Sequence, residues 1–158
     1  NGEFTRHRSN CQMSFGNNVI VGDYQNGNIY SFDLEDYSDN GSIQKWLRSW
    51  RALPTGQNNL KRTAQHSLQL DIESGTGLNL GQGSDPEVML RWSDDGGHTW
   101  SNEHWAQIGK IGEYYRRVFW RRLGMTVKLR DRVYELSGTD PVKISIMGAE
   151  LILSPTNA

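Results

Sequence analysis

Residues 88–100 read VMLRWSDDGGHTW, and this stretch decides the fold. Its first part is apolar and aromatic, which favours a strand. The run Asp95-Gly96-Gly97 that follows is a turn signal, because Asp and Gly accept the positive φ of a tight turn. Thr99 and Trp100 then return to strand-forming residue types. The stretch is therefore typical of a β-hairpin.

The turn of this hairpin matches the Asp-box pattern Ser-x-Asp-x-Gly-x-Thr-Trp in full, at Ser93, Asp95, Gly97, Thr99 and Trp100. The Asp95 carboxylate is predicted to accept hydrogen bonds from amides across its own turn, and the two hydroxyls to complete the network. Gly97 is predicted to take the positive φ that closes the hairpin, and Trp100 to drop into the core beneath it. In sialidases and other propellers such a box lies away from the catalytic centre, so a structural role is expected.

Outward from this hairpin, the sequence reads as strands and turns. Residues 68–73 alternate apolar and polar side chains, as a half-buried strand requires. Similar patterns predict strands at 18–24, 28–34, 43–52, 64–73, 87–93, 116–123, 132–136, 142–147 and 150–153. For residues 42–53, the spacing of Trp46, Leu47 and Trp50 leaves a helix as the alternative.

We predict an all-β fold. A second hairpin unit spans residues 19–33 around an Asn-Gly turn. Two such units predict β-propeller-like blades with an Asp-box hairpin, either as a small propeller or as a fragment at the end of a larger one. A β-sandwich is the alternative, since short strands at this spacing fit both. The length favours a single all-β domain over residues 1–158.

Composition excludes several kinds of site. Cys11 is the only cysteine, which rules out an internal disulfide and a CxxC metal site and suits synthesis in a reducing cytoplasm. The histidines lack HxxxH or HExxH spacing; they are His7, His66, His98 and His104. No apolar run approaches 18 residues. We therefore expect no metal, no cofactor and no membrane insertion.

The charges are unevenly distributed although the net charge is only −1. Within residues 110–132, eight basic residues stand against Glu113 and Asp131, which gives +6 and leaves −7 for the remainder. The eight are Lys110, Arg116, Arg117, Arg121, Arg122, Lys128, Arg130 and Arg132. Such a basic ribbon, with aromatic residues between the charges, suits DNA phosphates, an acidic partner protein or a plain solvated surface. The sequence leaves these three interpretations open.

An enzymatic function is not expected. Glu113, Tyr114, Tyr115 and Arg116 are of the types that a sialidase uses, but the Arg-Ile-Pro type signature of those enzymes is missing. Carboxylates that a glycosidase would need lie in or beside predicted turns; they are Asp23, Asp33, Glu35, Asp36 and Asp39. No small-molecule substrate is therefore expected. The alternative is a carbohydrate-binding or sialidase-like propeller that acts on cell-surface glycans, with exposed tryptophans stacking on sugar rings; the candidates are Trp46, Trp50, Trp92 and Trp105.

A series of blocks resembles one family in order along the chain. The blocks are residues 21–30, 93–100, 108–114, 117–124, 130–135 and 140–143. They are similar to the C-terminal part of the packaged-DNA stabilisation, or tail accessory, proteins of short-tailed phages and related prophages. Members of that family are longer, and this chain begins at Asn1, so it is expected to be the C-terminal portion of a propeller-type tail protein.

The resemblance implies a structural virion protein. Such a subunit joins a homo-oligomeric ring below the portal, extends the DNA channel and helps to retain the packaged genome. Its expected partners are the portal and other tail proteins, with contact to the DNA backbone in the channel. The resemblance carries over no catalytic residue. It places the protein in the virion tail after synthesis in the bacterial host cytoplasm.

Overall fold

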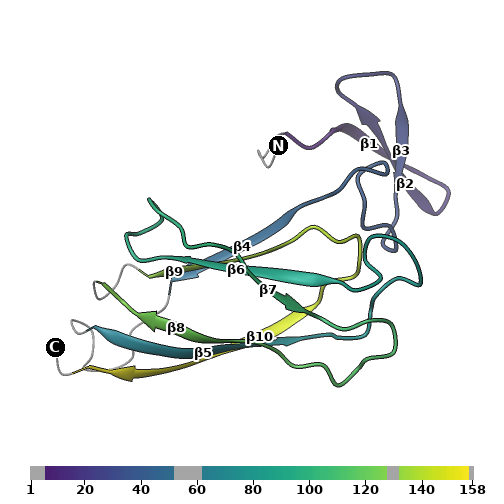
Figure 1. Cartoon of the computed structure of the whole chain (residues 1–158). Helices are drawn as coiled ribbons and strands as arrows, with labels where there is room; N and C mark the ends of the chain where they lie inside the picture. Colours follow the sequence, from purple (N-terminus) through teal and green to yellow (C-terminus); the bar gives the residue numbers. More distant parts are fainter. Residues whose placement is uncertain (1–5, 52–61, 128–131, 157–158) are drawn as a thin grey trace. The chain divides into compact units, whose positions relative to one another are not determined.

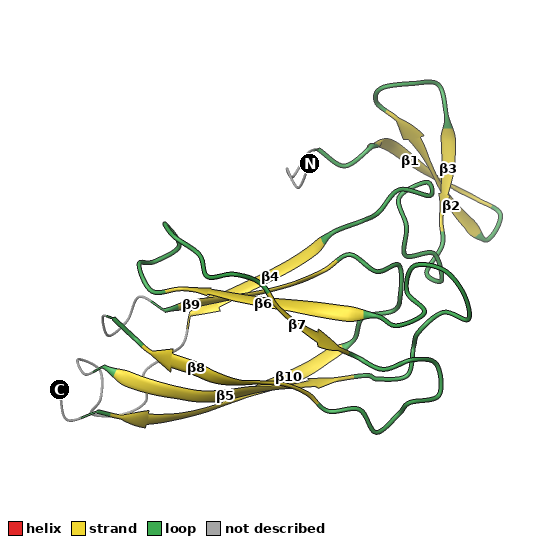
Figure 2. Ribbon diagram, in the orientation of Figure 1, coloured by secondary structure: helices red, strands yellow, loops and turns green. Residues whose placement is uncertain are grey.

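The computed structural model describes residues 6–51, 62–127 and 132–156, which form ten β-strands and no helix (Figure 2). The chain divides into two compact units, residues 1–42 and 43–158, and each is described by itself. The all-β class is thus confirmed, whereas the single domain over residues 1–158 stays a prediction.

The first unit is a three-stranded antiparallel sheet. Its strands are β1 (Ser9–Phe15), β2 (Asn18–Asp23) and β3 (Ile29–Phe32), in the order β1-β2-β3. The β2–β3 pair is the predicted hairpin, and its turn is held by side chains, because Asp23 accepts from the amide of Gln25 and Asn26 from that of Asn28. The sequence patterns did not predict β1.

Both faces of this first sheet carry exposed apolar side chains. The cross-strand register places Met13, Phe15 and Ile29 on one face and Val19 and Phe32 on the other. All five are exposed. Polar residues normally alternate outward on a sheet that faces water on one side. This sheet has little core of its own and offers apolar surface to a covering layer on each face.

The second unit consists of two antiparallel sheets (Figure 1). One has the strand order β10-β5-β8 and the other β4-β9-β6-β7. The bounds are β4 (Trp46–Arg51), β5 (Thr63–Ile72), β6 (Glu87–Ser93), β7 (His104–Gln107), β8 (Val118–Met125), β9 (Val133–Gly138) and β10 (Ile146–Pro155).

The core of this unit lies between the two sheets. Alternate residues of β5 and β8 point inward and meet those of β6 and β9, as the period of a strand requires. The core is formed by Leu68, Leu70, Ile72, Val88, Leu90, Ile108, Val118, Trp120, Leu123, Tyr134 and Leu136. On one side β7 and β8 close the sandwich, because the Trp120 indole Nε1 donates to the carbonyl of His104 at 2.9 Å.

The arrangement is a β-sandwich, the alternative that the strand spacing left open. A propeller blade is a meander of consecutive strands, whereas here β5 lies between β10 and β8, and β9 between β4 and β6. The described residues of this unit therefore do not form the predicted propeller blades. The hairpin motif around Asp95 is local, and so it did not distinguish the two folds.

Several element predictions need correction. Residues 46–51 form strand β4, not the alternative helix. The two strands predicted at 142–147 and 150–153 are one strand, β10, that begins at Ile146. The short strand β7 was not predicted, since residues 104–107 lack a clear alternation. It pairs with β6 as the true partner strand of the hairpin, so residues 94–103 form its connecting loop.

Candidate interaction surface

The turn after β6 contains the hydrogen bonds expected of the Asp-box pattern. The Asp95 carboxylate accepts from the amides of His98 and Thr99, both at 2.8 Å, and from the hydroxyls of Ser93 at 2.6 Å and Thr99 at 2.7 Å. Gly97 has φ 105°, and its amide donates to the Ser93 hydroxyl. The pKa of Asp95 is held well below its usual range by hydrogen bonds from the Ser93 and Thr99 hydroxyls and from the amides of Thr99 and His98.

Trp100, predicted to enter the core, does not do so. It is half-buried, lies outside the core cluster, and carries the Arg91 guanidinium over its ring at 4.7 Å from the centroid. Arg91 in turn pairs with Glu135 on the neighbouring strand β9. The aromatic residue that packs against the core is instead Trp92, one position before the box, because it lies on the inward face of β6.

Arg132 is buried and cannot belong to an exposed ribbon. Its side chain is 2% exposed and makes two 2.6 Å contacts with the Asp94 carboxylate. It also donates to the carbonyls of Leu123 and Met125, which lie on β8. Burial is the largest influence and lowers the pKa of Arg132, but the hydrogen bonds to Asp94, the Asp94 charge and the neighbouring Tyr134 together outweigh burial, so the pKa is raised. This residue is structural, which corrects the predicted partner contact.

The first exposed part of the predicted ribbon lies between β7 and β8. Lys110 pairs with Asp85 at 3.8 Å, and Arg116 donates to the side-chain oxygen of Gln107. Arg117 is exposed and forms no hydrogen bond or ion pair within the described part of the chain. Arg116 and Arg117 line a groove with Trp105.

The second exposed part lies on a bulge of β8. The register places Gln65 opposite Gly124 and Ser67 opposite Arg121, so one residue of β5 faces two of β8. Arg122 takes φ 59° there, and consequently Arg121 and Arg122 are both exposed while Leu123 still points into the core. Strict alternation would have turned Arg122 inward.

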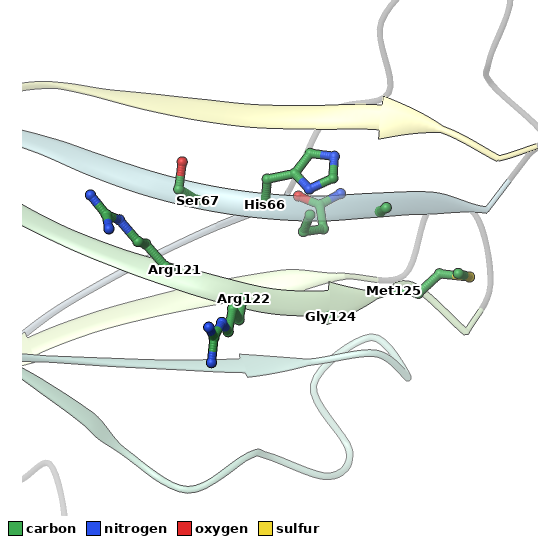
Figure 3. Close-up of a pocket in the computed structure, with 8 residues that line it drawn as sticks. His66, Ser67, Arg121, Arg122, Gly124 and Met125 are labelled. Carbon is green, nitrogen blue, oxygen red and sulfur yellow. The ribbon is translucent and has the colours of Figure 1, made fainter.

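A shallow pocket surrounds this bulge, with a volume of about 590 Å³. His66, Ser67, Arg121, Arg122 and Met125 contribute to its wall, and none of the described residues that line it carries a carboxylate (Figure 3). In Figure 3 the two arginine side chains leave β8 on opposite sides of the ribbon, so they do not converge on one point. Arg121 instead covers the ring of Phe119 at 4.6 Å.

The structure therefore divides the predicted ribbon. Arg116 and Arg117 lie at the start of β8, Arg121 and Arg122 on its bulge, and Arg132 inside the sandwich. Lys128 and Arg130 lie outside the described residues. Among the described residues, a continuous basic stripe is thus replaced by two separate exposed groups, Lys110 with Arg116 and Arg117, and Arg121 with Arg122.

The residues considered for sialidase chemistry do not converge. The Glu113 carboxylate accepts from the amide of Lys110, the Tyr114 carbonyl accepts from Ser74, and Arg116 contacts Gln107. Three acidic residues of the first unit hold turns: Asp23, Asp33 and Asp36 each accept from a main-chain amide two residues later.

No group of three His, Cys, Asp or Glu side chains suited to a metal ion occurs in residues 6–51, 62–127 and 132–156. In the same ranges, no helix has the length and apolarity needed to cross a bilayer.

The four tryptophans considered for sugar stacking differ in environment. Trp46, Trp50 and Trp92 are partly buried and pack against the core, as tryptophans of a thin sheet protein commonly do. Trp105 is 57% exposed and lies on the outer side of β7.

Two stacked antiparallel sheets, with a turn held by side-chain hydrogen bonds and with exposed arginine and aromatic residues, define a β-sandwich. Residues 45–153, more than half of the chain, match the family described as Bacteriophage P22 Gp10, beta-sandwich. The chain belongs to this family, which makes it a phage virion protein of the tail and head-completion type. No curated protein matched the sequence.

Proposed function

We propose that this protein is a non-catalytic part of the phage tail that attaches below the portal, extends the DNA channel and helps to retain the packaged DNA. The observation that carries the proposal is the family match, which coincides with the folded sandwich of the second unit. Such a role requires a rigid scaffold with contact surfaces, and it requires no active-site cleft.

The proposal also includes a propeller, of which the first unit of this chain would be a part. The sheet of this unit exposes Met13 and Phe15 on one face and Phe32 on the other. Strands with apolar residues on both faces are found where a sheet is covered on both sides. A blade between two neighbouring blades is covered in this way, so we assign the sheet to the end of a larger propeller.

The exposed arginines supply contacts for the proposed neighbours. Arg116 and Arg117 lie beside exposed aromatic residues, a composition enriched at protein interfaces. Arg121 and Arg122 lie in a pocket whose described lining residues carry no carboxylate, so contact with the DNA backbone is electrostatically favourable there. We assign the first pair to protein contact and the second to the DNA channel.

Light scattering of the purified chain, followed by negative-stain imaging with purified portal, tests the proposal. A collar of density on the portal is expected. Charge reversal at Arg121 and Arg122 should weaken binding of a duplex DNA in a gel shift and make the remaining binding less dependent on salt, since phosphate contacts release counterions. A chain that leaves the portal undecorated would refute the assigned position below the portal.

Carbohydrate binding remains the alternative function, and it is favoured by the exposure of Trp105. An exposed indole can stack on a sugar ring. Titration of oligosaccharides against tryptophan fluorescence would reveal this activity as quenching that is lost in Trp105→Ala. No quenching is expected if the tail-assembly proposal is correct.

A further inference from the structure

β7 and β8 are edge strands of the two sheets and contact each other. Side chains from this region line a groove. We call it the seam groove, and its volume is about 440 Å³. Its lining includes Glu87, Trp105, Gln107, Arg116, Arg117 and Phe119. It belongs to neither the Asp-box turn nor the pocket at the β8 bulge.

The seam groove has the chemistry of a protein-binding site. Trp105 is 57% exposed and Phe119 40% exposed, which provides an apolar wall open to solvent. Arg116 is oriented by Gln107, and the exposed Arg117 guanidinium has no partner in the described ranges. Two guanidinium groups against the single carboxylate of Glu87 make the groove favourable for an acidic segment that also brings an apolar side chain.

The loop that presents the two arginines is held in place. Gly109 has φ 114°, and a Cβ there would lie 3.0 Å from the carbonyl oxygen of Glu113. The Ser74 hydroxyl donates to the Tyr114 carbonyl at 2.8 Å, and the Tyr114 ring fills the space over Gly75. A site that is already ordered loses less conformational entropy on binding.

The chain itself contains a segment of the complementary chemistry. Residues 33–36 read Asp-Leu-Glu-Asp, so three carboxylates surround Leu34, which is 90% exposed. The segment has local order, because Asp33 accepts from the amide of Glu35 at 2.9 Å and Asp36 accepts from the amide of Ser38 at 2.9 Å. We call it the acidic turn. The exposed Glu35 side chain has no hydrogen-bond or ion-pair partner in the part of the chain that is described.

We propose that the acidic turn of one copy of this chain binds the seam groove of a second copy. Leu34 then packs against Trp105 and Phe119, and Glu35 lies close to Arg117. A protein segment fits better than DNA, because the apolar wall accepts Leu34 and the Glu87 carboxylate repels phosphate. The inference rests on the proposed ring function, since a contact between two different surfaces repeats from subunit to subunit and forms a ring when the rotation between subunits closes.

Sedimentation velocity over a range of protein concentrations tests this contact by charge exchange. Arg117→Glu and Glu35→Arg each place like charges opposite each other in the contact, so each variant alone should self-associate about tenfold more weakly than the unaltered chain. An equimolar mixture of the two variants restores opposite charges at every contact and should recover the association. The double variant Arg117→Glu/Glu35→Arg should recover it as well.

Arg48→Glu is the matched control, because it reverses an exposed arginine on β4, away from the groove, and should leave the association unchanged. A chain that stays monomeric at all concentrations would overturn the inference, and so would a mixture that fails to associate. Portal binding by a monomeric chain would separate the two proposals, because the tail function would then hold while this contact fails.

Discussion

Arg132 and Asp94 form a two-pronged ion pair, in which Nε and Nη2 each lie 2.6 Å from a different carboxylate oxygen. The same guanidinium donates to the carbonyls of Leu123 at 2.7 Å and Met125 at 3.2 Å. Asp94 belongs to the turn after β6, and the two carbonyls belong to β8 in the other sheet. One buried side chain thus connects the two layers of the sandwich at the edge of β8.

Arg132→Met is expected to lower the free energy of unfolding by about 3 kcal/mol, because it leaves Asp94 and two main-chain carbonyls without their partner. Urea unfolding should show this as a lower midpoint at an unchanged slope. Arg117→Met is the matched control, since that exposed side chain should change stability by no more than about 0.5 kcal/mol. Equal midpoints for the two variants would contradict the role given to Arg132.

The bulge on β8 predicts that glycine substitutions at two neighbouring arginines have different effects on the free energy of unfolding. Arg122 has φ 59°, a left-handed conformation that costs an L-residue roughly 1–2 kcal/mol and costs glycine almost nothing. Arg122→Gly should therefore be neutral or stabilise the protein by up to about 1 kcal/mol. Arg121→Gly, at an ordinary strand position, should destabilise it by about 1 kcal/mol.

Both glycine variants remove one guanidinium, so their charge change is the same; Arg121→Gly additionally removes the contact with the Phe119 ring. Chemical unfolding of the two variants side by side measures the difference. If Arg122→Gly lost as much stability as Arg121→Gly, the left-handed assignment at residue 122 would be wrong.

The same bulge shows what the sequence pattern could and could not predict. The sequence pattern predicted β5 and β6 closely. Both lie centrally in their sheets; β5 buries largely alternate residues, whereas β6 buries the consecutive residues Val88, Met89 and Leu90. The pattern could not predict that an extra residue in β8 leaves both Arg121 and Arg122 exposed. Nor could it distinguish blades from a sandwich, since that depends on which distant strands pair, as β5 does with β10.

The candidate site residues show the same difference between contacts that are close in the sequence and contacts that are distant in it. The contacts of Asp95 with Ser93 and Thr99 span a few residues, and so the motif alone predicted them. The partner of Arg132 is 38 residues away, and no local pattern marks Asp94 as that partner. From the sequence alone, Arg132 could therefore not be distinguished from the exposed arginines Arg121 and Arg122 of the predicted ribbon.

The Asp95 network predicts an acid-dependent stability. Hydrogen bonds from Ser93 and Thr99 lower the pKa of Asp95 in the folded state below its value in the unfolded chain. The stability that the ionised Asp95 contributes to the folded state is therefore fully present above the unfolded-state pKa of about 4, and it is lost as the pH falls towards the folded-state pKa. Asp95→Asn cannot titrate, so its melting temperature should fall less steeply between about pH 5 and pH 2.

Thermal unfolding across this pH range measures how steeply the melting temperature falls with pH for the unaltered chain and for Asp95→Asn. Asp71→Asn removes one carboxylate on the exposed face of β5, outside the network, and so separates the loss of the network from the loss of a charge. Parallel curves for Asp95→Asn and the unaltered chain would show that the turn does not contribute in the predicted way.

Gly138 and Trp46 are cross-strand neighbours on β9 and β4, and the indole occupies the space over the glycine. A Cβ at residue 138 would lie 2.6 Å from the Trp46 Nε1, so Gly138→Ala must displace a rigid ring. Overpacking of this kind costs roughly 1–3 kcal/mol. Within the described ranges the buried Nε1 has no acceptor, so displacement towards water restores a hydrogen bond and holds the loss near 1 kcal/mol. The tryptophan emission should shift to longer wavelength.

Gly148→Ala on β10 meets open space and should instead stabilise the protein by about 0.5 kcal/mol. Unfolding midpoints that move in the same direction for both alanine variants would argue against the packing of Trp46 on Gly138.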